Sequence, residues 1–538
     1  MLKICCLVRS GHAENLSRGL SARPNVKSKL FSTAVLGKPE FRDEITRALA
    51  EASVIFAYGC PEAFWDGYAD VLGEIRSRGV PVVSTGHDPG AFSRSDVAPE
   101  NARKALGYLL AGGPDNAALL VDFLAALAGR ENPETIRDLP GPVGKPSRGL
   151  WHPEADRDFF PDVESYLSWY RGRVESENLS EGTAGILFGR RFWANTGLEA
   201  ERELTRALED KGLSVIPAFC DPLKGADPNA PGPAEWARAC FLDDRGKPRV
   251  DVLVKLLSFF GTGEKPDDRS PVARRDEAVD NAPDRAPDRA PDNAPDNAPW
   301  ESDTPAAASA KLFEELGVPV FQPIFSSSGT VREWENDPRG VTAGIAWTVA
   351  MPEFEGAIEP FYLGGKKSVD GPDSFGLAGR EPSAERIKRF AARVRRRIKL
   401  GRKKPSERKV SFILHDNPCL SAEATLGSAS KLDAPESVAR ILKAMKENGY
   451  DVEVPESGKE LIGTMLEKKA VNEFRWTSAE DIVRSGGALA LLPAETYREW
   501  FDGFPESVRE KLVESWGLPP GEEKDGVPAA MVFDGKLA

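Results

Sequence analysis

Three glutamates stand close together in a part of the sequence that could do chemistry. Glu353, Glu355 and Glu359 fall within seven residues, just after the apolar stretch 345–351. Carboxylates at a hydrophobic edge either have raised pKa values, because burial disfavours the charged form, or share a cation. Both properties suit the removal of a proton from a bound molecule or the delivery of a divalent metal. The alternative interpretation is a solvated loop at the end of a strand, with acids that face water.

A histidine is the second candidate. The apolar run 410–415 is predicted to be a buried strand, and His415 is its last residue. His415 would then lie at the C-terminal edge of a parallel sheet, where open α/β folds bind their ligands. Asp416 beside it could fix the tautomer of the imidazole. The alternative interpretation is a histidine that ends the strand and hydrogen-bonds to the backbone.

The elements that must position these side chains alternate along the chain. In the first part, strands over 3–8, 53–58 and 80–85 are separated by amphipathic helices over 41–52 and 61–78. Such alternation predicts a parallel sheet covered by helices, because parallel strands need long right-handed crossovers. The same alternation returns twice, so the fold prediction is α/β, with several flavodoxin-like parallel-sheet units in series.

Three domains are predicted from this alternation. Residues 1–138 form an N-terminal α/β unit, residues 150–382 a second α/β domain, and residues 383–538 a third α/β unit, truncated at its C-terminal end. The third unit begins with a helix over 383–400. The apolar face of that helix consists of Ile387, Phe390, Val394 and Ile398.

Residues 264–305 interrupt the second domain. The unit Ala-Pro-Asp-Arg/Asn repeats there with a period of four residues. Proline at every fourth position blocks helix and sheet, and the tract has almost no apolar side chains to bury. Because the alternation of strands and helices resumes after it, the tract is predicted to be a disordered insertion in a folded domain. A linker between two domains is the alternative.

Composition argues against several classes of protein. The formal net charge of −13 argues against a general affinity for nucleic acid or for acidic membrane surfaces. No apolar run approaches the roughly 20 residues that cross a bilayer. The 6 cysteines include no C-x-x-C pair, and the 4 histidines include no H-x-x-x-H pair. This pattern indicates reduced thiols in the cytoplasm, and neither a disulfide framework nor a zinc site.

The stretch 409–433, followed by Ala434-Pro435-Glu436-Ser437, resembles a signature segment of a known family. That family is the large subunit of ATP-dependent cobaltochelatases and magnesium chelatases, the CobN type. This copy departs from the family at Asp416-Asn417, where Asn-Tyr is usual, and at Lys431, where Gly is usual. Further segments similar to the family, and in its order, are Trp151-His152-Pro153 and residues 182–189, 215–219, 317–323 and 351–360.

The resemblance implies a function. The family's large subunit binds the tetrapyrrole and is where the metal enters the ring, while AAA+ and integrin-like partner subunits hydrolyse ATP. Family members are typically more than twice as long, and their later half holds a run of the form H-x-G-x-H-G-x-x-E. The chain ends where residues 516–521 should lead into that half. It is therefore expected to be an N-terminal portion, from a split subunit or an interrupted gene, and incomplete by itself.

The expected function is tetrapyrrole binding for ATP-dependent cobalt insertion in cobalamin biosynthesis. A magnesium chelatase large subunit and a non-catalytic carrier of tetrapyrroles or metallophores are the alternatives. No tightly bound cofactor is expected: ATP and Mg are used by partner subunits, and cobalt is a substrate. The sequence holds no G-x-x-x-x-G-K-[ST] motif, which agrees with ATP chemistry on a partner. The expected partners are a corrinoid precursor, the ATPase subunits and a separate C-terminal half, without nucleic acid or membrane.

Site residues follow partly from the resemblance. Glu353 and Glu359 would line the route of the tetrapyrrole or the metal, His415 is a further candidate for substrate binding, and the catalytic residues are not identified. His152 is interpreted as a structural residue. The stretch 386–409 is dense in Arg and Lys and could dock an acidic partner subunit or attract the carboxylate edge of a tetrapyrrole. A simple exposed helix and a nucleic-acid surface are the alternatives.

Overall fold

The computed structural model describes residues 2–86, 89–221, 232–257, 305–368, 374–375, 378–415, 427–429, 431–468, 479–488, 490–519, 532–533 and 536–537. The chain divides into two compact units, Met1–Lys399 and Leu400–Ala538. The first unit contains two five-stranded sheets whose strands are mainly parallel, and the described part of the second unit consists mainly of helices. The finer division into three domains stays a prediction.

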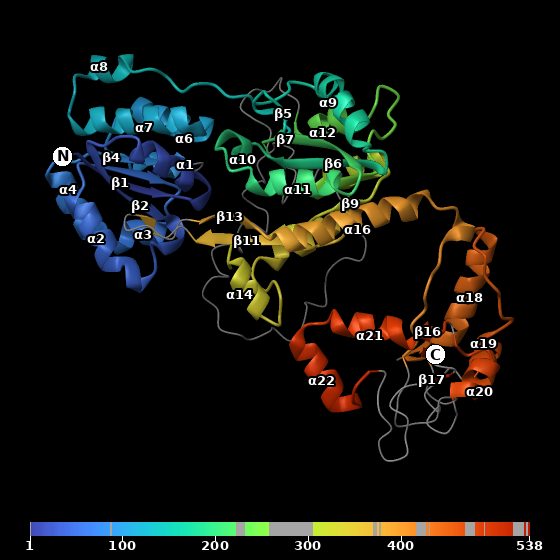
Figure 1. Ribbon diagram of the computed structural model, residues 1–538. Helices are drawn as coiled ribbons and strands as arrows, with labels where there is room; N and C mark the ends of the chain where they lie inside the picture. The colour runs from blue at the N-terminus through green and yellow to red at the C-terminus, as the bar shows by residue number, and fades with distance from the viewer. Residues whose placement is uncertain are drawn as a thin grey trace. The chain divides into compact units, whose positions relative to one another are not determined.

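A five-stranded parallel sheet occupies the start of the first unit (Figure 1). Its strand order is β12-β2-β1-β3-β4, and every neighbouring pair is parallel. The elements of this region are β1 (Leu2–Val8), α1 (Ser10–Ser21), β2 (Val26–Ser32), α2 (Arg42–Glu51), β3 (Val54–Tyr58), α3 (Glu62–Gly67), α4 (Ala69–Ser77), β4 (Val82–Thr85), α5 (Pro89–Ser93), α6 (Pro99–Ala111), α7 (Gly113–Ala128) and α8 (Pro133–Asp138), with 3-10 turns at Thr33–Val35 and Pro39–Phe41.

Helices cover both faces of this sheet. The interior strand β3 is buried over its whole length, as expected of parallel strands with helices on either side. On one face, α1 and α7 pack through residues such as Leu16 and Phe123. On the other face, α2 and α4 pack through residues such as Ile45 and Leu72. Figure 1 shows these two helical layers on either side of β1.

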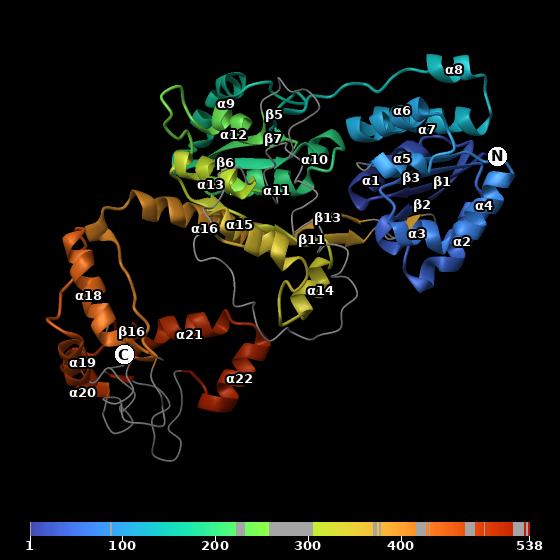
Figure 2. The same cartoon turned by 180° about the vertical axis from the view of Figure 1, so that it is seen from behind.

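A second five-stranded sheet follows, in the order β5-β7-β6-β8-β9, and β5 alone runs antiparallel to its neighbour. One hydrophobic core joins this sheet to its helices, which Figure 2 shows from behind. The elements are β5 (Arg148–Leu150), α9 (Val163–Glu177), β6 (Gly182–Gly189), α10 (Arg190–Ala194), α11 (Glu199–Glu209), β7 (Leu213–Cys220), α12 (Pro233–Phe241), β8 (Val252–Lys255), α13 (Pro305–Leu316) and β9 (Val320–Phe321).

A small sheet and a long helix complete the first unit. β10 runs parallel to β11, β11 runs antiparallel to β13, and β12 returns to the edge of the first sheet beside β2. The predicted apolar face of the helix over 383–400 is confirmed, since all four of its residues are buried. The elements are β10 (Ile324–Phe325), α14 (Val331–Asn336), a π-helical turn (Ala346–Ala350), α15 (Met351–Phe354), β11 (Tyr362–Ser368), β12 (Ser374–Phe375), β13 (Ala378–Pro382) and α16 (Ala384–Arg402).

The second unit differs from the prediction in its strands. The strand predicted over 410–415 is wrong, because the structure describes this segment as irregular. A strand is stabilised by a neighbouring strand, and the hydrophobicity of residues 410–415 alone does not supply one. The elements here are a 3-10 turn (Pro405–Glu407), β14 (Ser428–Ala429), β15 (Leu432–Asp433), α18 (Ala434–Glu447), α19 (Gly458–Glu467), α20 (Ala479–Arg484), β16 (Leu492–Pro493), α21 (Ala494–Asp502), α22 (Glu506–Trp516), β17 (Val532–Phe533) and β18 (Lys536–Leu537).

The α/β fold class with several parallel-strand sheets is confirmed. The strand order 2-1-3-4 within the first sheet is that of flavodoxin-like folds. The tract 264–305, predicted to be a disordered insertion, lies outside the described residues. Among the helices of the described residues, none is both long and apolar enough to cross a membrane.

Candidate functional site

A cavity of about 360 Å³ lies where the carboxyl ends of both parallel sheets meet, and we call it the two-sheet cavity. Open α/β folds bind their ligands at this end of the sheet, in the loops that follow the strands. The small sheet β10-β11-β13 contributes a further wall. The lining residues that follow β1, β2, β6, β8 and β9 are Gly11, Asn15, Ala34, Arg191, Phe192, Leu256 and Gln322.

Arg380 of β13 is the best-positioned cation of the two-sheet cavity. Its guanidinium carbon lies 3.3 Å from the ring centroid of Phe192 and 5.1 Å from that of Phe325. Its Nη2 donates to both carboxylate oxygens of Glu201, at 2.8 and 2.6 Å. Glu201 on α11 is 0% exposed, so Arg380 neutralises a carboxylate that has no access to water. The stack and the ion pair together fix the orientation of the guanidinium.

Further cations line the same space. Arg191 lines the cavity with an exposed side chain, and partial desolvation together with nearby Arg380 lowers the pKa of its guanidinium below the ordinary value. Lys366 and Lys367 of β11 also line the cavity, and Glu199 adds one carboxylate. With the aromatic rings of Phe192 and Phe325, the cavity suits a flat ligand with negative charge at its edge.

Two buried carboxamides belong to the same lining. Asn15 is 7% exposed and Gln322 is 6% exposed. The Nδ2 of Asn15 donates to the carbonyl of Gly113 at 2.9 Å, which leaves Oδ1 as the free end of the amide. Within the described part of the chain, neither Asn15 Oδ1 nor Gln322 Oε1 has a hydrogen-bond partner. Each is therefore a buried acceptor that a donor would stabilise.

A buried ion pair lies at the end of β8. The Nζ of Lys255 donates to Oε2 of Glu355, and the two side chains are 0% and 1% exposed. Ser309 hydrogen-bonds to the same carboxylate. Burial raises the pKa of Glu355 and lowers that of Lys255, while the opposite charge of the partner counteracts both shifts. Of the three glutamates singled out in the sequence, Glu355 is thus the one that the fold buries.

Glu353 and Glu359 lie in different surroundings. Glu353 is exposed on α15. Glu359 is half-buried and accepts hydrogen bonds from Nε and Nη2 of Arg393, at 2.9 and 2.6 Å. Its backbone φ of +59° is in the left-handed region, so the turn that carries it is strained for a side chain other than glycine. Neither residue lines the two-sheet cavity, and their place on a tetrapyrrole or metal route stays a prediction.

His415 belongs to the second unit. Its side chain is exposed, and its carbonyl accepts a hydrogen bond from the backbone N–H of Gly427 at 2.8 Å. The strand that was expected to carry it to a sheet edge is not formed, and Asp416 lies outside the described residues. A role of His415 in substrate binding stays a prediction.

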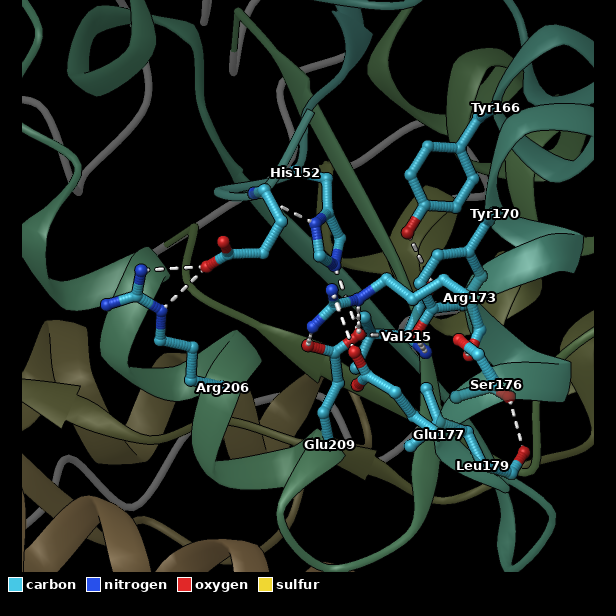
Figure 3. Close-up of polar contacts among 12 residues, drawn as sticks. His152, Tyr166, Tyr170, Arg173, Ser176, Glu177, Leu179, Arg206, Glu209 and Val215 are labelled. Carbon is cyan, nitrogen blue, oxygen red and sulfur yellow. Dashed lines mark hydrogen bonds and ion pairs between the residues drawn. The ribbon is translucent and has the colours of Figure 1, made fainter. Parts of the chain in front are cut away.

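His152 takes part in a buried network around Glu209, which Figure 3 shows. The N–H of Glu154 donates to His152 Nδ1 at 3.2 Å, so Nε2 carries the proton that faces Glu209 Oε1 at 3.1 Å. Tyr170 donates to the same oxygen at 2.7 Å, and Arg173 donates to both oxygens at 3.2 and 3.1 Å. The network ties the chain before α9 to α9 and α11, which supports the structural interpretation of His152.

The same network should make stability depend on pH. Burial alone would raise the pKa of Glu209, but hydrogen bonds from His152, Arg173 and Tyr170 outweigh it and lower the pKa from 4.5 to about 2. A carboxyl group whose pKa is lower in the folded than in the unfolded protein stabilises the fold at pH values above its unfolded pKa. This stabilisation is lost as pH falls from about 4.5 towards 2. Chemical denaturation over this range should show a slope that Glu209→Gln reduces by up to about 1.4 kcal/mol per pH unit. Equal slopes for both proteins would contradict the assignment.

The basic stretch predicted to dock a partner is partly paired within the first unit. Arg395 and Lys399 form ion pairs with Glu181, at 2.8 and 3.1 Å. The guanidinium carbon of Arg386 lies 4.1 Å from the ring centroid of Phe361. These contacts attach α16 to its own unit, and docking of a partner subunit stays a prediction. In the described part of the chain, no group of three or more His, Cys, Asp or Glu residues could hold a metal ion.

Sequence reasoning missed the residues of the two-sheet cavity. Arg380 and Glu201 are 179 residues apart, and nothing in the local pattern joins them. A usable signal was present at the strand ends, because Arg191 is the second residue after β6 and Gln322 is the first residue after β9. Polar residues at that position of a parallel sheet are candidates for ligand binding.

Comparison with known proteins places these observations in a family context. The family model described as CobN/Magnesium Chelatase matches residues 106–536. An uncharacterised protein of Methanocaldococcus jannaschii is 33% identical over 512 residues, which are 95% of this chain and 35% of that protein. The aerobic cobaltochelatase subunit CobN of Sinorhizobium sp is 27% identical over 81% of this chain and 29% of its own length. The chloroplastic magnesium-chelatase subunit ChlH of Oryza sativa subsp. indica is 26% identical over 78% of this chain and 26% of its own length.

A solved structure shows the same fold. The catalytic subunit of cobaltochelatase from Mycobacterium tuberculosis superposes with a TM-score of 0.54 at 23% identity. The match covers 97% of this chain and 36% of that one. The chain thus spans about a third of the length of the relatives it matches.

Proposed function

Because the chain belongs to the CobN/magnesium chelatase family, we propose that it binds a tetrapyrrole and takes part in the insertion of a divalent metal into the ring. The observation that supports this function is the two-sheet cavity, which combines cationic and aromatic side chains. A tetrapyrrole is flat and apolar, with carboxylates at its periphery, so its edge matches this lining. A volume of about 360 Å³ admits one edge of such a ring rather than the whole macrocycle.

In this proposal the chain's own residues bind and orient the ring. Arg191 and Lys366 pair with peripheral carboxylates, since charge-assisted hydrogen bonds to a carboxylate are the strong ones. Phe192 and Phe325 contact the tetrapyrrole. The guanidinium of Arg380 lies over both phenyl groups and keeps these two side chains in place. Insertion also requires the removal of two pyrrole protons. We assign that step to the remaining two thirds of the longer family subunits, and we keep Glu353, Glu359 and His415 as candidates along the route.

Cobalt is the proposed metal substrate, and cobalamin biosynthesis in the cytoplasm the proposed setting. ATP hydrolysis is assigned to AAA+ and integrin-like partner subunits, which agrees with the lack of a phosphate-binding G-x-x-x-x-G-K-[ST] motif in this sequence. Relatives of both the cobalt and the magnesium type match this chain, so magnesium is the competing substrate. Insertion assays with equal cobalt and magnesium, in the presence of the partners and ATP, distinguish the two.

An absorbance titration tests ring binding directly. The purified chain should shift the absorption band of a corrinoid precursor or a carboxylate-bearing porphyrin at micromolar concentrations. The fully esterified ring should bind at least about tenfold more weakly, because it cannot pair with the cations. Added cobalt should stay outside the ring when the chain is alone. Absence of binding would overturn the proposed function, and cobalt insertion by the chain alone would overturn the dependence on partners.

A further inference from the structure

The segment that follows β6 connects the two five-stranded sheets of the first unit. Residues 190–196, which we call the junction segment, contain α10 and supply Arg191 and Phe192 to the wall of the two-sheet cavity. The same segment hydrogen-bonds to the helical layer of the first sheet, where Asn195 Oδ1 accepts from the backbone N–H of Gly113 at 3.1 Å. The position of the junction segment therefore decides how the two sheets enclose the cavity.

Arg190, the first residue of the junction segment, is a buried cation surrounded by carbonyl groups. The residue is 9% exposed. Its Nε donates to the carbonyl of Pro146 at 2.6 Å. Its Nη1 donates to Leu110 at 3.3 Å, and its Nη2 donates to Ala111 and Lys145 at 3.3 and 3.2 Å. One guanidinium thus binds the end of α6, the chain before β5 and the end of β6 to one another.

Two features explain why this position holds an arginine. Leu110 and Ala111 are the last residues of α6, where the helix dipole places partial negative charge. A guanidinium presents its N–H donors in a planar fork, whereas the donors of lysine share one nitrogen and cannot reach carbonyls on separate segments. The Asp221 carboxylate, at 3.9 Å from Nε, is too distant for a hydrogen bond. The cation is therefore stabilised mainly by the carbonyls that it connects.

The chain after α6 approaches the junction segment too closely for side chains. Gly112 and Gly113 have φ values of +71° and +86°, which glycine adopts at little cost. A Cβ on Gly112 would lie 2.6 Å from Oδ1 of Asn195, and one on Gly113 would lie 3.1 Å from the carbonyl oxygen of Ala194. The hydrogen bonds of Arg190 therefore maintain an interface in which two backbones are in close contact.

We propose that Arg190 is a positioning residue, which keeps the two sheets at the spacing that forms the two-sheet cavity. It is not among the residues that line the cavity, and it acts through Arg191 and Phe192, the next two residues of the chain. Without its hydrogen bonds the junction segment separates from α6, and Phe192 loses its place against Arg380. This inference rests on the proposed function, because ring binding is the property that the spacing serves. It adds a residue outside the cavity that controls the affinity for the ring.

The ring affinity of the folded protein tests the assignment. Arg190→Lys and Arg190→Met are titrated with a carboxylate-bearing porphyrin, at a temperature at which circular dichroism shows each variant to be folded. Both should bind at least about tenfold more weakly than wild type, because a charge-assisted pairing at the ring edge is lost. A merely structural role would lower the thermal midpoint and leave the affinity of the folded protein unchanged. If the methionine variant does not fold, the lysine variant gives the result.

Arg173→Lys is the matched control. Arg173 also donates to buried groups of the first unit, but it connects α9 to Glu209 of α11 and does not line the two-sheet cavity. The control variant should have a lower thermal midpoint and the wild-type affinity for the porphyrin. An equal loss of affinity in Arg173→Lys would show general damage and overturn the assignment to Arg190.

Hydrogen exchange without ligand separates this inference from the proposed function. In Arg190→Lys the backbone N–H of Gly113, which donates to Asn195, should exchange at least about tenfold faster than in wild type, while the amides of β3 and β6 keep their rates. Unchanged exchange at Gly113, or wild-type affinity in folded Arg190→Lys, would overturn the inference while ring binding stands. Failure of wild-type protein to bind the porphyrin would overturn the proposed function, whatever the exchange rates are.

Discussion

Replacing Lys255 with methionine is expected to lower the free energy of unfolding by about 3–5 kcal/mol. The reason is the carboxylate left behind, since Glu355 is 1% exposed and Lys255 is its ion-pair partner at the end of β8. Methionine has nearly the volume of lysine, so the packing against Phe313 is largely kept. Urea denaturation of the two proteins at pH 7 measures the difference.

A double variant separates the lost pair from other damage. Lys255→Met combined with Glu355→Leu removes both charges, and it should recover most of the stability lost in the single variant, because a buried ion pair is often replaceable by apolar side chains. A single variant as stable as wild type would show that the carboxylate reaches water or a proton in the folded protein. A double variant no better than the single one would place the damage in packing.

The second large effect is expected at Arg380. Changing it to lysine should weaken binding of a carboxylate-bearing porphyrin about tenfold or more, while the free energy of unfolding changes little. Lysine keeps a positive charge for Glu201, which is fully buried, but it cannot stack as a plane on Phe192. Absorbance titration gives the affinity, and the urea midpoint gives the stability.

Arg380→Met provides the contrast to the lysine variant. It leaves the Glu201 carboxylate without a cation, so a loss of stability of about 3–5 kcal/mol should accompany the loss of binding. Adding Glu201→Leu should restore the stability but not the affinity for the ring. Wild-type affinity in Arg380→Lys would exclude the two-sheet cavity as the place where the ring edge is held.

Local pattern explains which elements could be predicted from the sequence. The strands β1, β3 and β4 were predictable because each is a short run of apolar residues. The helix α16 was predictable because its apolar residues, such as Ile387, Phe390 and Val394, recur at helical spacing. β2 was missed because Lys27 and Lys29 interrupt its apolar residues. The apolar run ending at His415 was misassigned as a strand, since hydrophobicity indicates burial but does not supply a neighbouring strand.

The candidate site was predictable only in its general position. A ligand site at the C-terminal edge of a parallel sheet was expected for His415, whereas the residues that lie at such an edge are Arg191 and Gln322. The choice among the glutamates was not predictable, because Glu355 is buried by Lys255, which is 100 residues away. Arg380 likewise depends on Glu201 and Phe192, both distant in sequence. Such pairs are properties of the tertiary fold, and a single sequence carries no local trace of them.

The return of β12 to the first sheet has a consequence for synthesis of the protein. β1, β2, β3 and β4 are all complete once Thr85 has left the ribosome, whereas the strand beside β2 is supplied by Ser374 and Phe375. Domains usually begin to fold from the N-terminus during translation. The nascent sheet therefore has an open edge along Leu30 and Phe31 until much of the chain has been made. An open edge pairs readily with foreign strands, so aggregation during expression should be most acute for chains that stop before residue 374.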